Sequence, residues 1–289
     1  MVRPLRFGFN SQTAESNSFQ NKEGMNESSA IQESALKEFD AMVELLRANN
    51  IEVTVFDDIS SDTPDSIFPN NWISFHQEAV VLYPMMAENR RTERRNDIIE
   101  SLNRSKKTID LSIQESEQIY LEGTGSIVFD YENRIAYANI SPRTNKILLE
   151  DLCRQLNYTA ITFKAVDQQG ADIYHTNVLM CIGSTFCVIC PDCMPDKTER
   201  THILESLEKN GHEIIPITYA QLNSFAGNMY QLLNSKGESC IVMSKQAFNS
   251  LNSDQLTALK KHGILLTPEL FTIEKFGGGS ARCMMADVR

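Results

Sequence analysis

Hydrophobic and polar positions follow one pattern four times along the chain. Each occurrence begins with two β-rich runs separated by a turn, continues with an amphipathic helical stretch and ends with a short apolar run. The turns at 131–133 and 183–184 have residues typical of hairpins. In the third helical stretch Ile203, Leu204 and Leu207 share one face, as an amphipathic helix requires. The pattern predicts four ββαβ units.

The first β-rich runs are evenly spaced. They begin 51 to 54 residues apart, near Trp72, Ser126, Val178 and Met229. One further step of 54 residues reaches Cys283, so 283–288 is predicted to be the first strand of a fifth unit. The other parts of that unit would come from the beginning of the chain, with a partner strand in 5–10, a helix in 28–50 and a last strand in 51–57.

Five such units predict one α/β domain over residues 1–289. The units would form a five-bladed ring with pseudo-five-fold symmetry, in which the N- and C-terminal segments share one blade. Closure of a ring leaves few unpaired sheet edges. An open α+β sheet with chance spacing is the alternative.

Composition and charge narrow the class of partner. The 289 residues are 42% hydrophobic and carry a formal net charge of −11, which disfavours nucleic acid and anionic membranes as partners. No apolar run approaches the ~20 residues of a membrane span, and the first residues lack the apolar core of a signal peptide. Most of the seven cysteines lie in apolar runs, so we expect a reducing, cytoplasmic location. They are Cys153, Cys181, Cys187, Cys190, Cys193, Cys240 and Cys283.

Equivalent loops of a radial fold meet near its axis, so the segments before the first strands are the place to seek a site. These segments carry Asn70, Asn71, Glu122, His175, Asn177, Asn228 and Cys283. Taken singly, the thiol, the imidazole and the carboxylate each have an ordinary structural explanation. Their joint occurrence at equivalent positions predicts a nucleophilic site in which the four amides contact the substrate.

Several motifs together resemble the guanidino-group-modifying superfamily, which has the pentein fold. They are FPNNW, LEGTGSIVFD, SPRT, DIYHTNV, AGNM and GGGSARCM, and they extend over nearly the whole chain. Within the superfamily the chain looks most similar to the citrulline-utilisation hydrolases, or citrulline ureidases. The resemblance implies a five-bladed α/β propeller with Cys283 as nucleophile, His175 as general acid and base, and Glu122 as the partner of His175.

The resemblance also implies how a substrate is held. Asn70 and Arg143 correspond to residues that bind the substrate carboxylate in arginine deiminases, and a guanidinium suits that task. Deiminases have aspartates where this chain has His76 and Asn177. A cationic guanidinium would lose two partners here, whereas a neutral ureido group can use the donors and acceptors of amide and imidazole groups. We therefore expect citrulline rather than arginine as the substrate.

The expected reaction is hydrolysis of citrulline to ornithine, ammonia and carbon dioxide through a covalent cysteine intermediate. An amino acid is the expected partner, no cofactor or metal is expected, and self-association stays open. The alternatives are an arginine or methylarginine deiminase, a dimethylargininase, and a non-catalytic binding protein of the same fold.

Three other segments are interpreted as follows. The single CxxC at 190–193 predicts a turn at a strand end rather than a zinc site, because no second pair of ligands accompanies it. The basic run at 90–95 is expected to lie on a solvated face. The polar stretch at 10–28 is either a lid over the site or disordered.

Overall fold

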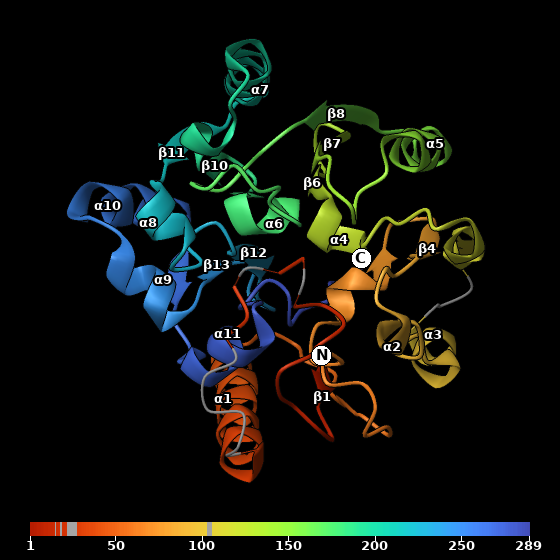
Figure 1. Cartoon of the computed structure of the whole chain (residues 1–289). Coiled ribbons are helices and arrows are strands. Elements are labelled where there is room, and N and C mark those ends of the chain that lie inside the picture. The colour runs from red at the N-terminus through yellow and green to blue at the C-terminus, as the bar shows by residue number, and fades with distance from the viewer. Residues whose placement is uncertain (15, 18, 22–27, 103–105) are drawn as a thin grey trace.

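A computed structural model provides the structure of the chain, and it describes residues 1–14, 16–17, 19–21, 28–102 and 106–289. Short strands and helices alternate along these residues. Five small sheets are arranged around a centre, and the long helices lie outside them (Figure 1). The fold is therefore α/β.

Four of the five sheets are built alike. In each, an antiparallel hairpin provides two strands, and the second of these pairs in parallel with a third strand that follows a helix. The strands of the four sheets are β3 (Ile73–Phe75), β4 (Ala79–Leu82) and β5 (Lys107–Asp110); β6 (Val128–Asp130), β7 (Ile135–Asn139) and β8 (Thr159–Phe163); β9 (Met180–Ile182), β10 (Phe186–Ile189) and β11 (Glu213–Pro216); and β12 (Tyr230–Leu233), β13 (Ser239–Val242) and β14 (Ile264–Leu266). The four predicted ββαβ units are confirmed.

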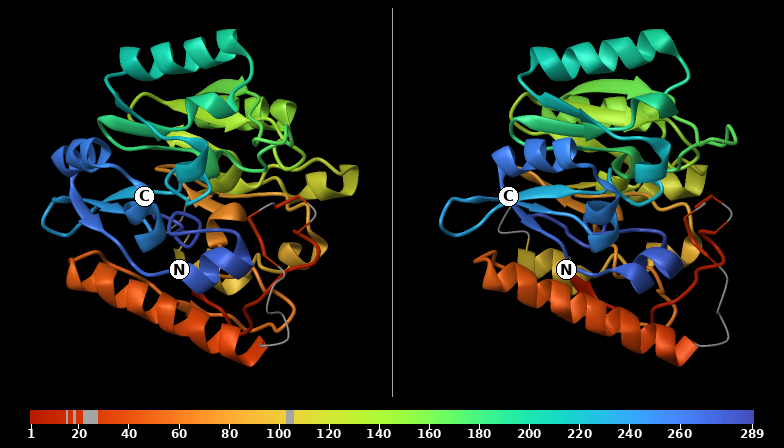
Figure 2. Two further views of the ribbon diagram at one scale, coloured as in Figure 1. Left: turned by 60° about the vertical axis from the view of Figure 1, so that its left-hand side comes forward. Right: turned by 90° about the vertical axis from the view of Figure 1, so that its left-hand side faces the viewer.

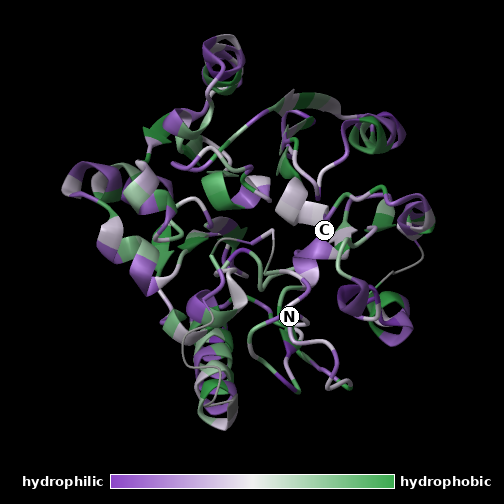
Figure 3. Ribbon diagram, in the orientation of Figure 1, coloured by the Kyte–Doolittle hydropathy of each residue, from purple (hydrophilic) through white to green (hydrophobic). Residues whose placement is uncertain are grey.

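The long helices form the outside of the molecule. They are α1 (Ser28–Ala48), α5 (Lys146–Leu156), α7 (Lys197–Lys209) and α10 (Ser253–His262), and the shorter α3 (Asn96–Leu102) also lies on the outside. Figure 2 shows α1 and α7 at opposite edges. These helices carry both hydrophilic and hydrophobic residues (Figure 3), and α5 buries Leu148, Leu149 and Leu152 against its sheet. The side chain of Asn145 accepts a hydrogen bond from Leu148 N and so fixes where α5 begins.

The remaining helical elements are short. They are α2 (Glu88–Arg91), α4 (Gly123–Ser126), α6 (Thr176–Leu179), α8 (Tyr219–Leu222), α9 (Lys245–Ser250), α11 (Phe271–Gly277) and the 3-10 turns η2 (Pro69–Asn71), η3 (Ser112–Glu117) and η4 (Pro191–Cys193). Three of them, η2, α4 and α6, directly precede first strands of the repeated units. Figure 1 places α4 and α6 close to the centre of the molecule.

The fifth unit departs from the prediction. Within the described part of the chain its sheet has two strands, β1 (Val2–Arg3) and β2 (Phe56–Asp57), which pair in parallel. The strand predicted in 5–10 therefore lies earlier in the chain, and 283–288 forms no strand. The N–H groups of Cys283, Met284 and Met285 donate to carbonyls three residues earlier, so they cannot join a ladder.

The two ends of the chain nevertheless share one hydrophobic cluster. Phe7 and Phe39 belong to the same buried cluster as Ala281, Cys283 and Met284. This packing agrees with a unit shared between the terminal segments, while closure into a symmetric five-bladed ring stays a prediction. Within the described residues, no helix is long and apolar enough to cross a lipid bilayer.

Candidate active site

Six predicted site residues lie on the turns that precede first strands, and a seventh, Cys283, lies in a turn that no strand follows among the described residues. Asn70 and Asn71 are in η2, Glu122 and His175 immediately precede α4 and α6, Asn177 is in α6, Asn228 precedes β12, and Cys283 is in the turn after α11. All seven side chains are buried. The repeated architecture therefore brings segments that are far apart in sequence to one interior region.

The thiol of Cys283 is held by two amides. Asn177 Nδ2 and Asn228 Nδ2 lie 3.4 and 3.3 Å from its sulfur and donate to it. Asn228 also donates to the Asn177 carbonyl at 2.9 Å and accepts from Arg282 N at 3.0 Å, which fixes the orientation of its amide. Two N–H donors aimed at sulfur stabilise negative charge on it.

His175 and Glu122 form a buried pair, and His175 is two residues before Asn177, which contacts the thiol of Cys283. His175 Nε2 lies 2.8 Å from Glu122 Oε2, which Arg143 Nη1 also approaches at 3.4 Å. Burial alone would raise the pKa of Glu122, but Arg143 and His175 together hold that pKa well below its usual value. Burial lowers the pKa of His175 to about 4, although Glu122 opposes this shift. At neutral pH the pair is a carboxylate and a neutral imidazole, which can act as a base.

Gly125 allows Asn71 and His175 to approach each other. A Cβ at this position would lie 2.4 Å from Asn71 Nδ2 and 2.6 Å from His175 Nδ1, so these two nitrogens are within about 5 Å of each other. Such contacts are shorter than any side chain tolerates. The glycine is thus required for the two side chains to occupy these positions.

Arg90 is a buried part of this region that sequence reasoning missed. The prediction of a solvated run at 90–95 is wrong for this residue, whose side chain is 3% exposed. Its guanidinium pairs with Glu93 at 2.9 Å and donates to Asn71 Oδ1 at 2.9 Å and to the Phe68 carbonyl at 3.2 Å. Because Asn71 Oδ1 faces Arg90, Asn71 Nδ2 is turned toward Gly125. The only sequence signal was an Arg–Glu pair three residues apart, which is common on exposed helices.

The described part of 10–21 lies over Arg143 and over a second buried acid, Asp65. Arg143 donates through Nε to Ser16 Oγ and through Nη2 to the Thr13 carbonyl, both at 3.0 Å. Asp65 Oδ2 accepts from Asn10 Nδ2 at 2.8 Å, while Asp65 Oδ1 has no hydrogen-bond partner among the described residues. These contacts order the described residues of the segment beside Arg143 and Asp65, and a role as a lid stays a prediction. Residues 15, 18 and 22–27 of the predicted stretch are outside the described residues.

His76 is not brought to this group. Its Nε2 lies 3.0 Å from Ser74 Oγ, and its ring packs against Phe129, Tyr131 and Tyr158 at centroid distances of 5.0 to 6.1 Å. Burial, followed by nearby cations, lowers the pKa of His76 to about 4. The predicted substrate contact is replaced by an aromatic environment, because His76 lies beyond β3 while Asn70 and Asn71 lie before it.

Several buried amide atoms lack partners within the described part of the chain. They are both side-chain polar atoms of Asn70, Asn71 Nδ2 and Asn177 Oδ1. Buried polar atoms are normally hydrogen-bonded, and leaving one unpaired costs ~1–3 kcal/mol. A ligand with both donors and acceptors would satisfy this set.

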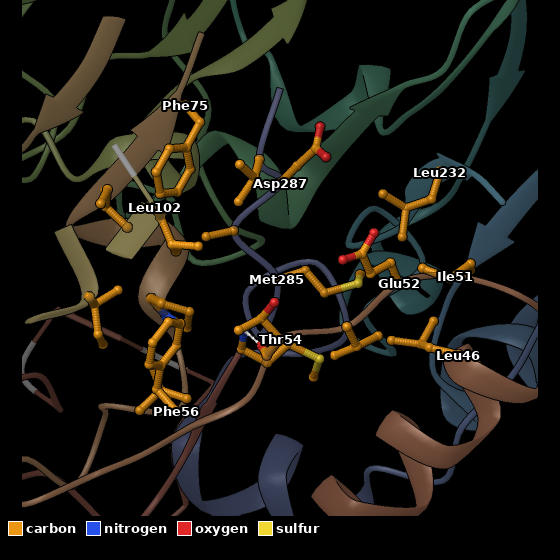
Figure 4. Close-up of a pocket in the computed structure, with 18 of the residues that line it drawn as sticks. Leu46, Ile51, Glu52, Thr54, Phe56, Phe75, Leu102, Leu232, Met285 and Asp287 are labelled. Carbon is orange, nitrogen blue, oxygen red and sulfur yellow. Dashed lines mark hydrogen bonds between the residues drawn. The ribbon is translucent and has the colours of Figure 1, made fainter. Parts of the chain in front are cut away.

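A cavity of about 330 Å³, lined by both apolar and polar groups, lies elsewhere. It is lined by side chains such as Leu46, Phe56, Phe75 and Met285 (Figure 4), and by none of the seven site residues. Among the residues that the structure describes, no three His, Cys, Asp or Glu side chains are grouped as a metal site requires.

Comparisons with known proteins support a family and a fold. A family model described as N,N dimethylarginine dimethylhydrolase, eukaryotic, matches residues 3–289. The comparison with curated protein sequences gave no match.

Three solved structures have a similar fold at low sequence identity. A variant of the N-terminal domain of ArgZ, covalently bound to a reaction intermediate, is 17% identical with a TM-score of 0.79, over 100% of this chain and 96% of that chain. ArgZ is described as an arginine dihydrolase from the ornithine–ammonia cycle in cyanobacteria. AgrE with ornithine and NAD⁺ is 19% identical with a TM-score of 0.77, over 100% of this chain and 39% of that chain. A dimethylarginine dimethylaminohydrolase adduct with S-methyl-L-thiocitrulline is 14% identical with a TM-score of 0.66, over 98% and 96%.

Proposed function

Because the chain belongs to the eukaryotic-type N,N-dimethylarginine dimethylhydrolase family, we propose that it is a cysteine-dependent hydrolase of the ureido group of citrulline or a closely related amino acid. One water is consumed, and ornithine, ammonia and carbon dioxide are formed. The particular likeness to citrulline ureidases belongs to this proposal. So does a closed five-bladed ring with the site on its axis.

The main support for a ureido group, rather than a guanidinium, as the reacting group of the substrate is the set of amides around the thiol. Asn177 and Asn228 contact the sulfur, and Asn70 and Asn71 have unpaired amide atoms. The nearby carboxylate of Glu122 is already engaged by His175 and Arg143. One unpaired carboxylate oxygen, Asp65 Oδ1, lies in the region and is assigned below to the α-ammonium group. A guanidinium cation would need a further free carboxylate, whereas a ureido group offers N–H donors and a carbonyl acceptor that amides satisfy.

Charged side chains support an α-amino acid as the rest of the substrate. The buried Arg143 suits the α-carboxylate, whose oxygens would replace the Ser16 and Thr13 oxygens that it now contacts. The unpaired Oδ1 of Asp65 suits the α-ammonium group. Burial raises the pKa of Asp65, and an α-ammonium group beside it would favour its ionised form. Opposite charges at the two positions would then select a zwitterion.

In the first step Cys283 attacks the ureido carbon, and the neutral His175 takes the thiol proton. The C=O electron pair moves to oxygen as the C–S bond forms. When the carbonyl re-forms, one C–N bond breaks, and His175 returns the proton to the departing nitrogen. Glu122 stabilises the imidazolium that exists between the two transfers.

In the second step His175 takes a proton from water, which attacks the carbonyl carbon of the S-acyl intermediate. The C–S bond then breaks with its electron pair returning to sulfur, and His175 supplies the proton that restores the thiol. If ornithine departs first, the released carbamate separates into ammonia and carbon dioxide. If ammonia departs first, the carbamate of ornithine loses carbon dioxide.

The family description favours a second candidate, hydrolysis of arginine or methylated arginine to citrulline. Separate incubations with citrulline, arginine and N-methylated arginines, analysed by chromatography and mass spectrometry, distinguish the two. Ornithine and ammonia from citrulline, absent with Cys283→Ser, support the proposal. Citrulline formed from an arginine, without ornithine formed from citrulline, contradicts it. A binding protein would give no product from any of these compounds.

A further inference from the structure

The turn that carries Cys283 is connected to a buried glutamate on α11. Ser280 Oγ donates to Glu274 Oε1 at 2.5 Å, and the carbonyl of Ser280 accepts from Cys283 N at 2.9 Å. Ser280 and Glu274 are 0% and 1% exposed. Two consecutive hydrogen bonds therefore join the Glu274 carboxyl to the backbone of Cys283.

Glu274 is held in place by the helix that carries it. At the start of α11, Glu38 of α1 accepts from Thr272 N at 2.8 Å and from Ile273 N at 3.0 Å. At its end, Gly278 N donates to the Glu274 carbonyl at 3.0 Å, in a left-handed conformation with φ of 63°. With both ends of the short helix anchored, the carboxyl of Glu274 is a fixed point against which Ser280 is positioned.

The carboxyl of Glu274 has few compensating partners. Its Oε2 has no hydrogen-bond partner among the described residues. Burial raises the pKa of Glu274 to about 7, the hydroxyls of Ser244 and Ser280 lower it, and the charge of Glu38 raises it further. The neighbouring cation, Lys275, instead lies 5.3 Å from the centre of the Phe276 ring. The Glu274 carboxyl thus changes its protonation near neutral pH, and it is hydrogen-bonded to Ser280 in the turn that carries Cys283.

We propose that Glu274 is a positioning residue for the nucleophile, and that its ionised carboxyl, through Ser280, sets how Cys283 is presented to Asn177 and Asn228. This inference rests on the assignment of Cys283 as the nucleophile. An ionised carboxylate is the stronger acceptor for the Ser280 hydroxyl, so protonation of Glu274 loosens the turn. His175 and Glu122 do not change charge in this range, because the pKa of His175 is about 4 and that of Glu122 is lower still.

The test compares Glu274→Gln and Ser280→Ala with Glu269→Gln, a matched control that removes an exposed carboxylate from the segment preceding α11. For Glu274→Gln we expect kcat to fall by about 10- to 100-fold with little change in KM, since displacement of a reacting group by ~1 Å costs on the order of 100-fold. The component of the wild-type kcat profile that Glu274 contributes as pH decreases through about 7 should be absent from this variant, whereas any component from Glu93, whose pKa burial also raises to about 7, is common to both proteins. Ser280→Ala should reproduce the loss of kcat, and the control should behave as wild type.

The rate of Cys283 alkylation by iodoacetamide, measured against pH, gives a readout that needs no substrate. In the wild type this rate should show the Glu274 ionisation, and in Glu274→Gln it should not. A folded Glu274→Gln protein with wild-type kcat and wild-type pH profiles would overturn the inference. If that variant does not fold, Ser280→Ala decides, and wild-type kcat and alkylation profiles in it would overturn the inference equally. Failure of turnover with every substrate, but with the alkylation difference present, would refute the proposed function alone.

Discussion

Replacement of Glu122 by glutamine tests the role of the buried carboxylate without changing its shape. Glu122 Oε2 lies 2.8 Å from His175 Nε2, and both side chains are almost completely buried. The substitution keeps one acceptor oxygen for His175 but removes the negative charge. In the substrate-free enzyme little should change for His175, because burial already keeps its pKa at about 4 and the imidazole is neutral.

The cost should fall on the transition states, in which His175 is an imidazolium. Two unit charges 2.8 Å apart interact by ~6 kcal/mol at an effective dielectric constant of about 20. The retained hydrogen bond offsets part of this loss, so we expect ~3–5 kcal/mol, which corresponds to a fall in kcat of roughly 10²- to 10⁴-fold. Arg143 also loses a buried partner at 3.4 Å, so the free energy of unfolding should fall by ~3 kcal/mol.

Rapid-quench measurement of ornithine release from citrulline gives kcat, and urea denaturation of the same sample gives the free energy of unfolding. Rates must be compared at a temperature at which both proteins are fully folded. A folded Glu122→Gln enzyme with kcat within about tenfold of the wild type would refute the assignment of Glu122 as the partner that stabilises charged His175.

Three further outcomes are expected. Gly125→Ala should lower kcat strongly in a folded protein, because the added Cβ displaces His175 and Asn71, as kinetics with a thermal-melting control will measure. His175 and His76 should each contribute about 3 kcal/mol of stability that is lost as pH decreases from 6.5 toward 4, since the unfolded imidazoles bind protons that the buried ones do not. The raised pKa values of Glu274 and Glu93 act in the opposite direction over this range, so the test is the difference between two proteins: His76→Gln should lose about 3 kcal/mol less than the wild type between pH 6.5 and 4, by urea denaturation. Asp130→Ala should lower the free energy of unfolding by about 3 kcal/mol, measured by urea denaturation, because it removes the carboxylate that lies 2.7 Å from buried His212.

The sequence predicted the parts of the fold that depend on local periodicity. Alternating apolar runs around short turns are sufficient to form the four hairpins, and the amphipathic stretches between them form the outer helices. The prediction of a strand at 283–288 was wrong, because the equal spacing of the repeated units does not determine which backbone groups form hydrogen bonds. The backbone there forms consecutive turns that hold Cys283 in place.

The shared burial of Cys283, His175 and Asn177 follows from their equivalent positions in the repeated unit, while their roles stay predictions. Sequence reasoning missed a residue of this region where a side chain reaches the interior from a peripheral element. Arg90 lies on α2 in a basic run whose sequence predicts exposure. Only the folded structure shows that it is buried, where it pairs with Glu93 and donates to Asn71. His76 is the opposite case, because it was predicted to contact the substrate. It lies at the far end of β3 from Asn70 and Asn71, and its ring is buried among aromatic rings.

The central claim is that Cys283 becomes covalently attached to the carbon of the substrate's terminal C–N group. Mass spectrometry of peptides from enzyme quenched in acid during citrulline turnover tests it most directly. We predict an adduct with the mass of a carbamoyl group, or of carbonyl-linked ornithine, on the peptide that contains Cys283, and none in Cys283→Ser. Ornithine production by Cys283→Ser at the wild-type rate would contradict the claim, as would turnover with Cys283 already alkylated.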